Sequence, residues 1–480
     1  MLRARMLSIV LLWVAHSAAS VSATPSFPVE LLGVWRAPGY GMVLDVRAEG
    51  ITAYGESAAG CLVDKAVTQE LAGESAGAFA QVEVLGPARV RASASATATR
   101  YTLERLEAVP EACAQGMSRE PQAAFEYLVA VMDAHYPFFT ARGVDWPTRV
   151  AGAREALGPR PSAKRLRRVL GELLRGFDDS HLSLSGKTGW VGGFELPPPD
   201  SRTLVPLIRA TLEDPQDDRA LRKALNRWYG QQITQTNAVL FAGAGTRRSG
   251  LPLMWGKLGN VGVVVQIGMQ GFTDGGTEAQ EVAAAHAIFD EIIDDFAAVD
   301  AVVFDVSLNF GGFGEVAQAV ASRFATQERF AYSRFVPAEG DDSRQRVMIT
   351  PSQRSRFTGP VYLLTSDQTV SAGEEFAMLM RVQDNVVHYG EPTHGSLSDL
   401  LPKTLPNGWV LTLSNQIYTM ADGVCYEGRG VPPEQPMTLF RAGNLKTARF
   451  DAVKALAAIA REQVREVRQA RSAIGAVGEW

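Results

Sequence analysis

Long apolar runs are missing from this sequence beyond its first residues, because no later stretch reaches the roughly 18 apolar residues of a membrane span. An excess of one charge is missing as well, since 47 Lys and Arg oppose 52 Asp and Glu. The net charge of −5 therefore gives no electrostatic reason to expect nucleic acid or an anionic membrane as a partner. With 46% hydrophobic and 21% charged residues, the composition excludes a disordered, collagen-like or long coiled-coil chain.

Metal-ligand patterns are also lacking. The six histidines are scattered and form no His-x-x-x-His pair. A Gly-x-Gly-x-x-Gly phosphate loop is absent too. We therefore predict neither a metal site nor a cofactor. The histidines are His16, His135, His181, His286, His388 and His394.

The N-terminus has the pattern of a secretory signal peptide. Arg3 and Arg5 precede an apolar run over 6–15, and small residues follow at 21–23. The run is short for a membrane span, although a retained anchor is the alternative. We expect residues 1–23 to be cleaved and the chain to be exported to the periplasm or secreted, with no stable membrane span afterwards.

The cysteines number only three. Cys61 and Cys113 lie in one N-terminal segment, and an exported protein can keep a disulfide. They are the natural pair, which leaves Cys425 as the odd residue. Two unpaired buried thiols are the alternative.

The residue patterns divide the chain into segments. Short alternating runs between Gly and Ser turns predict a β-rich accessory domain over 24–116. Helical spacing of apolar residues then predicts a small bundle. Residues 214–229 are predicted to be helical, and 447–469 a closing helix. The expected divisions are 24–116 (β-rich domain), 117–190 (helical bundle), 191–256 (linker or helical insert), 257–445 (α/β core) and 446–480 (C-terminal helix).

The strongest pattern is that of a layered α/β core. Apolar strand-like runs alternate with amphipathic helical stretches, as in strand–loop–helix units. The expected strands are 261–267, 301–306 and 360–365, and the expected helices are 277–298, 315–324 and 372–382.

Two loops of this core carry candidate chemistry. Ser371 lies between a strand and a helix, where a hydroxyl can be exposed as a nucleophile. A helix N-cap is the simpler interpretation of this serine taken alone. Gly311 and Gly312 follow another strand and could present N–H groups to an oxyanion, or form only a tight turn.

A series of motifs makes the interpretation more specific. In chain order they are Asp179-Ser180-His181, Asp305-Val306-Ser307-Leu308-Asn309-Phe310-Gly311-Gly312, Val370-Ser371-Ala372-Gly373-Glu374, Gly390-Glu391-Pro392-Thr393-His394-Gly395 and Glu427-Gly428-Arg429-Gly430-Val431-Pro432-Pro433. In this order the chain resembles the tail-specific (C-terminal processing) serine peptidase superfamily, which includes tricorn-type peptidases and the modules of interphotoreceptor retinoid-binding protein. The resemblance covers roughly 117–445. It implies a crotonase-like layered α/β core with a helical bundle, and a peptide or protein substrate.

The resemblance also implies roles for residues. One branch of the family uses a Ser–Lys dyad, but Ser396 occupies the Lys position here. The tricorn-like branch uses an early Ser-His pair and a later Glu. It implies Ser371 as nucleophile, His181 as general base, and Glu427 and Ser180 as supporting residues. Gly312, Gly311 and Ala372 would supply the oxyanion N–H groups.

Alternatives remain at this stage. A non-catalytic ligand- or peptide-binding protein on the same scaffold is one, and an esterase with the same triad is another. Ser307 stands where the family usually has Arg, and Glu434 stands where it usually has Asp. His394 could line the pocket or replace the base. Lys403, the nearest Lys after Ser396, is expected to have no catalytic role.

Overall fold

The protein, seen in a computed structural model, divides into two compact units of three segments each. The structure describes residues 27–74, 79–95, 97–186, 189–193, 201–246 and 252–477. The predicted signal peptide, 1–23, and the predicted loop at 197–199 lie outside the described residues. Unit 1 is Met1–Leu196, Arg334–Gln345 and Ser398–Tyr418, and unit 2 is Pro197–Ser333, Arg346–Leu397 and Thr419–Trp480.

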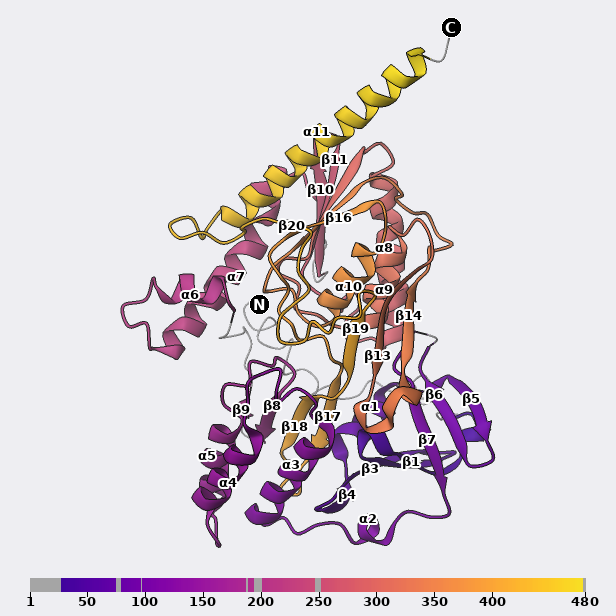
Figure 1. The fold of residues 1–480 in the computed structure, drawn as a ribbon, viewed down its shortest axis with the longest axis vertical. Helices are drawn as coiled ribbons and strands as arrows, with labels where there is room; N and C mark the ends of the chain where they lie inside the picture. Colours follow the sequence, from indigo (N-terminus) through magenta and orange to yellow (C-terminus); the bar gives the residue numbers. More distant parts are fainter. Residues whose placement is uncertain are drawn as a thin grey trace. The chain divides into compact units, whose positions relative to one another are not determined.

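A seven-stranded antiparallel sheet begins unit 1 (Figure 1). Its spatial order is β4-β3-β2-β1-β7-β6-β5. Buried residues alternate with partly buried ones in β3, because one face of the sheet packs on a core. The small β-rich domain expected from the sequence is therefore present. Its strands are β1 Gly33–Ala37, β2 Met42–Arg47, β3 Gly50–Ser57, β4 Gly60–Val63, β5 Gln81–Gly86, β6 Arg89–Ser93 and β7 Tyr101–Leu106.

The predicted disulfide is confirmed. Cys61 on β4 is bonded to Cys113 on the short helix α2, Glu111–Gln115. Both cysteines are buried beside Val34 and Val43 of the sheet. The bridge therefore joins the sheet to the segment that leads out of it. The other helix beside this sheet is α1, Lys65–Glu74.

Unit 1 continues with three helices and a second sheet. The helices are α3 Pro121–His135, α4 Trp146–Leu157 and α5 Ala163–Leu173. Asp145 and Ser162 accept N–H bonds at the starts of α4 and α5, which is the role of an N-cap. The antiparallel sheet has the order β17-β18-β8-β9. Its strands are β8 Ser183–Gly186, β9 Gly189–Gly193, β17 Leu400–Thr404 and β18 Val410–Ser414.

Unit 2 is built on a six-stranded sheet with the order β10-β11-β12-β15-β16-β20. Only β10 runs antiparallel to its neighbour. All residues of β11, β12 and β15 are buried, as expected for parallel strands covered on both faces. The strands are β10 Leu253–Leu258, β11 Val261–Gln266, β12 Ala301–Asp305, β15 Val361–Thr365, β16 Val386–Gly390 and β20 Gln435–Pro436.

Helices pack on both faces of this sheet, as neighbouring residues of β12 show. Val303 belongs to the core shared with α7 and α11, whereas Phe304 packs with Phe289 of α8 and Phe376 of α10. The layered α/β fold predicted from the sequence is therefore confirmed. The helices are α6 Leu204–Arg209, α7 Asp218–Phe241, α8 Glu278–Asp295, α9 Gly314–Ser322, α10 Ala372–Arg381 and α11 Ala448–Val477.

Two helices differ in extent from the prediction. The helix expected at 214–229 is α7, which begins after its N-cap Asp217 and continues to Phe241 because Ile233 and Leu240 extend its buried face. The closing helix α11 continues to Val477. No helix among the described residues is long and apolar enough to cross a membrane.

Three further strands form a sheet with the order β14-β13-β19. They are β13 Arg329–Phe335, β14 Gln345–Ile349 and β19 Ile417–Met420. The boundary between the two units falls within each of them.

Candidate active site

Ser371 lies at the turn from β15 into α10, as predicted. Its backbone has φ 56° and ψ −125°, which is strained for a residue with a side chain. Among the described non-glycine residues, only Asp178, Ala242 and Ser371 have positive φ. Ser371 is partly exposed, whereas the nine residues that follow it, Ala372–Met380, are buried. A strained strand-to-helix turn of this kind can present a serine hydroxyl as a nucleophile.

The buried carboxylate of Glu374 holds this turn. Its Oε2 accepts N–H bonds from Ser371 at 3.2 Å and Ser396 at 2.8 Å. Its Oε1 accepts the Thr393 hydroxyl at 2.6 Å and the Gly395 N–H at 2.7 Å. Burial raises the pKa of Glu374, and these hydrogen bonds oppose that rise. Glu374 therefore joins the start of α10 to the loop 393–396.

The Gly311–Gly312 loop packs directly against Ser371. A Cβ added to Gly311 would lie 2.8 Å from Ser371 Cβ and 3.3 Å from its Oγ. A Cβ added to Gly312 would lie 2.5 Å from the Met269 backbone carbon. Both glycines also have positive φ, 85° and 140°. Only glycine fits this close approach of backbone to the candidate nucleophile.

The backbone N–H groups of Gly311, Gly312 and Ala372, the three oxyanion candidates, are not equivalent. Gly311 donates to Asn309 Oδ1 at 3.0 Å, so its N–H is already used. Within the described ranges, Gly312 and Ala372 have N–H groups that donate to no other group. Ala372 is also the first residue of α10, where the helix dipole favours negative charge. The oxyanion interpretation therefore concerns Gly312 and Ala372 in preference to Gly311.

Glu427 lies in the same unit, on a loop packed against 393–397. Its carboxylate is buried, and Oε2 accepts the Leu397 N–H at 2.8 Å. The neighbouring Gly428 N–H donates to Gly395 O at 2.8 Å. Ser371 donates its own N–H to Ser396 O at 3.2 Å. Ser371 and Glu427 are thus held by consecutive residues of one segment.

His181 belongs to unit 1, in the turn before β8. Asp179 holds this turn, because its Oδ1 accepts the His181 N–H at 2.9 Å and the Ser414 hydroxyl at 3.1 Å. Its Oδ2 accepts the Tyr136 hydroxyl at 2.9 Å. The turn is strained too, with φ 50° at Asp178. Three hydrogen bonds therefore hold the Asp179 carboxylate, and one of them fixes the backbone of His181.

The electrostatics favour a neutral imidazole. Burial lowers the pKa of His181, while Asp179, Asp399 and a backbone hydrogen bond to Ser398 partly oppose this. The Asp179 carboxyl, although burial raises its pKa, has a net lowered pKa because Arg142, His181 and its hydrogen bonds favour the charged form. A neutral imidazole beside a permanent carboxylate is suited to accept a proton.

The predicted site residues thus fall in both units. Unit 2 brings together Ser371, Ala372, Gly311, Gly312 and Glu427, and unit 1 carries Ser180 and His181. His394 is buried, with Nδ1 3.3 Å from Asp367 O. No group of His, Cys, Asp or Glu in the described part of the chain could hold a metal ion.

Three residues were given no role by the sequence reasoning. Glu374 could have been found, because Ser followed three residues later by Glu is the capping-box pattern of a helix start. Asn309 accepts N–H groups from Gly311 and Val370, and in the sequence it stood out only as a member of a motif. Arg449, described below, gave no local signal.

Comparison with known proteins is consistent with this geometry. Residues 263–437 match the family model of Peptidase family S41. A putative peptidase from Parabacteroides merdae ATCC 43184 shares 20% identity and a TM-score of 0.53, covering 71% of this chain and 96% of that one. Mature CPAF is 13% identical in sequence, with a TM-score of 0.51. The match covers 72% of this chain and 98% of that one. No curated protein matches the chain.

The two structural likenesses show the fold, which is that of a peptidase. The α/β core, over residues 263–437, is similar to peptidase family S41, and the protein is a serine-type peptidase. The resemblance inferred from the motifs is therefore confirmed. A peptide or protein is its class of substrate.

Proposed function

We propose that this protein is an exported peptidase that hydrolyses peptide bonds through an acyl-enzyme on Ser371. The observation that carries the proposal is the strained turn of Ser371, against which the loop of Gly311 packs so closely that a Cβ on Gly311 would lie 2.8 Å from Ser371 Cβ. His181 is the general base, and Glu427 and Ser180 support it.

The chemistry follows from these roles. Ser371 Oγ attacks the carbonyl carbon of the scissile bond and gives its proton to His181. The Gly312 and Ala372 N–H groups stabilise the oxyanion that forms on the carbonyl oxygen. The C–N bond then breaks, and the leaving amine takes the proton from His181. Water, activated by His181 in the same way, hydrolyses the ester and frees Ser371.

Export is supported by two observations. The N-terminal residues have the pattern of a signal peptide, and the Cys61–Cys113 disulfide is of a kind that persists in oxidising compartments. We therefore propose that the protein acts outside the cytoplasm.

Labelling with a fluorophosphonate tests the nucleophile. We expect the wild type to be labelled on Ser371 and the Ser371→Ala variant to remain unlabelled with its circular dichroism unchanged. Ser355→Ala, which changes an exposed serine of the same unit, is the matched control and should label normally. Full labelling of Ser371→Ala would exclude Ser371. Comparison of peptide and ester turnover then separates a peptidase from an esterase.

A further inference from the structure

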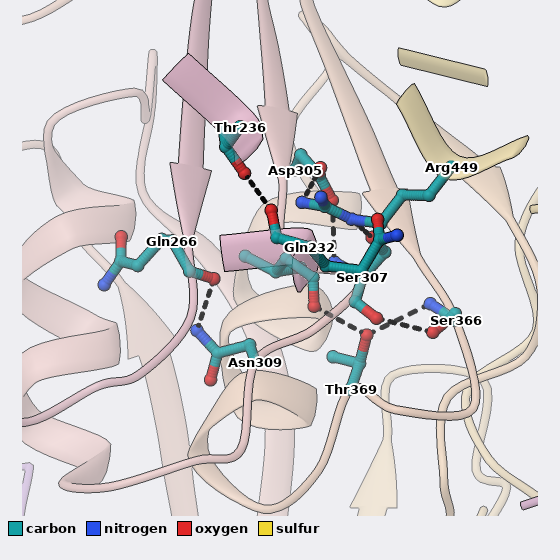
Figure 2. Close-up of polar contacts among 10 residues, drawn as sticks. Gln232, Thr236, Gln266, Asp305, Ser307, Asn309, Ser366, Thr369 and Arg449 are labelled. Atoms are coloured by element: carbon teal, nitrogen blue, oxygen red, sulfur yellow. Dashed lines mark hydrogen bonds and ion pairs between the residues drawn. The ribbon is translucent and has the colours of Figure 1, made fainter. Parts of the chain in front are cut away.

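A guanidinium lies buried in unit 2 beneath the loops that carry the candidate site. Arg449, the second residue of α11, is 1% exposed. Figure 2 shows its side chain reaching Asp305 and Ser307. Nη2 lies 2.5 Å from Asp305 Oδ2, and Nε donates to Ser307 Oγ at 3.0 Å. The closing helix thereby binds the carboxyl end of the central strand β12.

The segment bound by Arg449 is hydrogen-bonded to the loop before Ser371. Ser307 O accepts the Ser366 hydroxyl at 2.6 Å (Figure 2). Val306 O accepts the Thr369 hydroxyl at 2.8 Å. The Ser307 N–H in turn donates to Asp305 Oδ1 at 2.9 Å. A displacement of Ser307 would therefore displace the loop 366–369.

The same segment also leads to the oxyanion loop. The Asn309 N–H donates to Val306 O at 3.0 Å. Asn309 then accepts two N–H groups, that of Val370 on its backbone oxygen at 2.9 Å and that of Gly311 on its side chain at 3.0 Å. Both residues adjoin a proposed reacting group, Val370 next to Ser371 and Gly311 next to Gly312.

Stability alone gives no reason for this buried ion pair. Removing two charges from water costs about as much as their attraction returns, and apolar residues of similar size are often as stable. A guanidinium is planar and rigid, and its N–H donors point in fixed directions. It can therefore fix the positions of two acceptors at once, and this pair of fixed donors is called its fork here.

We infer that Arg449 is a positioning residue, which brings a guanidinium from the C-terminal helix to the carboxyl end of β12. It neutralises the charge of Asp305 and fixes the position of Ser307. In this way it keeps Ser371 and Gly312 in the relative positions that catalysis requires. This inference rests on the proposed role of Ser371 as nucleophile.

Arg449→Lys is the principal test, because it keeps the charge and removes the fork. We expect fluorophosphonate labelling and kcat to fall about 10- to 100-fold with KM little changed, as expected when catalytic groups are displaced by roughly 1 Å. A second variant, Arg449→Met combined with Asp305→Asn, removes both charges and leaves none buried without a partner. This double variant should fold and show a similar loss of labelling and of kcat.

Rescue distinguishes positioning from general stabilisation. Ser307→Arg in an Arg449→Ala background returns a guanidinium to the carboxyl end of β12, and we expect labelling to recover to within a few-fold of the wild type. Arg323→Lys is the matched control. Arg323 is a fully buried Arg of the same unit, and it binds Asp290, Ser355 O and His286 O. This variant should lose stability and label normally.

The outcomes separate the two hypotheses. A wild-type protein that is never labelled would refute the proposed function. Wild-type labelling retained by folded Arg449→Lys, or by the charge-free double variant, would refute the positioning role alone. An equal loss of labelling in Arg323→Lys would also overturn it, because any buried Arg would then have the same effect.

Discussion

Gly311 lies so close to Ser371 that a Cβ on it would stand 2.8 Å from Ser371 Cβ. Gly311→Ala should therefore push the two loops apart and reduce kcat about 100-fold, since catalytic groups tolerate little displacement. Gly443→Ala is the control, because Gly443 has a similar φ of 79° but nothing within 4 Å of a Cβ. The measurement is peptide turnover. Equal losses in both variants would show that backbone strain, and not contact with Ser371, is responsible.

The pH dependence of kcat/KM should report His181. A base must be neutral, so activity should rise with pH through the pKa of His181. Burial lowers that pKa, so half-maximal activity should lie below the ordinary value of about 6.5. A pH–rate profile of the wild type checks this. A midpoint well above 6.5 would contradict the assignment.

Substitution of the base and its supporting carboxylate should give graded losses. His181→Ala should reduce kcat at least about 1000-fold, because it removes the group proposed to take the Ser371 proton. Glu427→Gln should cost less, because Glu427 carries no proton in the reaction and a glutamine oxygen can still accept the Leu397 N–H. Turnover of the two variants under identical conditions is the measurement. Near-full activity of His181→Ala would show that a group other than His181 is the general base.

Lys403 should affect stability and leave catalysis intact. It is buried, its Nζ donates to Gly41 O at 2.9 Å, and burial lowers its pKa to about 8 although Asp64 and Glu56 oppose this. Its pKa in the unfolded chain is about 10.4, so the unfolded state holds more protons between these values and stability rises with pH there. The total rise is about 3 kcal/mol.

Lys403→Met should lack this rise between about pH 8 and 10.4 and should label like the wild type. Urea denaturation of both proteins across that range is the measurement. The same rise in the variant, or a loss of labelling, would contradict the prediction.

Removing the disulfide should weaken the fold and spare the chemistry. Cys61→Ser combined with Cys113→Ser opens a loop with a sequence separation of 52. In the chain-entropy model this costs about 4 kcal/mol. Thermal unfolding should show a lower midpoint, with kcat of the folded protein unchanged. An unchanged midpoint would mean that the bridge does not stabilise the native state.

The disulfide could be predicted from the number and placement of the three cysteines, and the order of the core elements could be predicted because its signals are local. The apolar run that forms β11 and the helical spacing in α8 depend on neighbouring residues alone. The α8 start has a further local signal, a capping box between Thr277 and Gln280. Ser371 was likewise identified by its place between a strand and a helix, and by the motifs around it.

The strands late in the core were not predicted, because their partners are distant in sequence. β18 pairs with β8 through Val410 and Ser185, and residues 398–418 pack within unit 1 although the sequence surrounds them with core elements. Such pairing depends on long-range packing, which the local pattern of residues does not encode.

The sequence by itself determined the resemblance to a peptidase family, the alternation of strands and helices, and the residue types available for chemistry. Only the tertiary structure decided how those residues are used. It gives Ser371 its strained φ, occupies the Gly311 N–H with Asn309, and brings Arg449 to Asp305 across 144 residues of chain. The reason is that a motif specifies which groups are present, whereas packing of distant segments fixes their orientation, hydrogen-bond partners and charge.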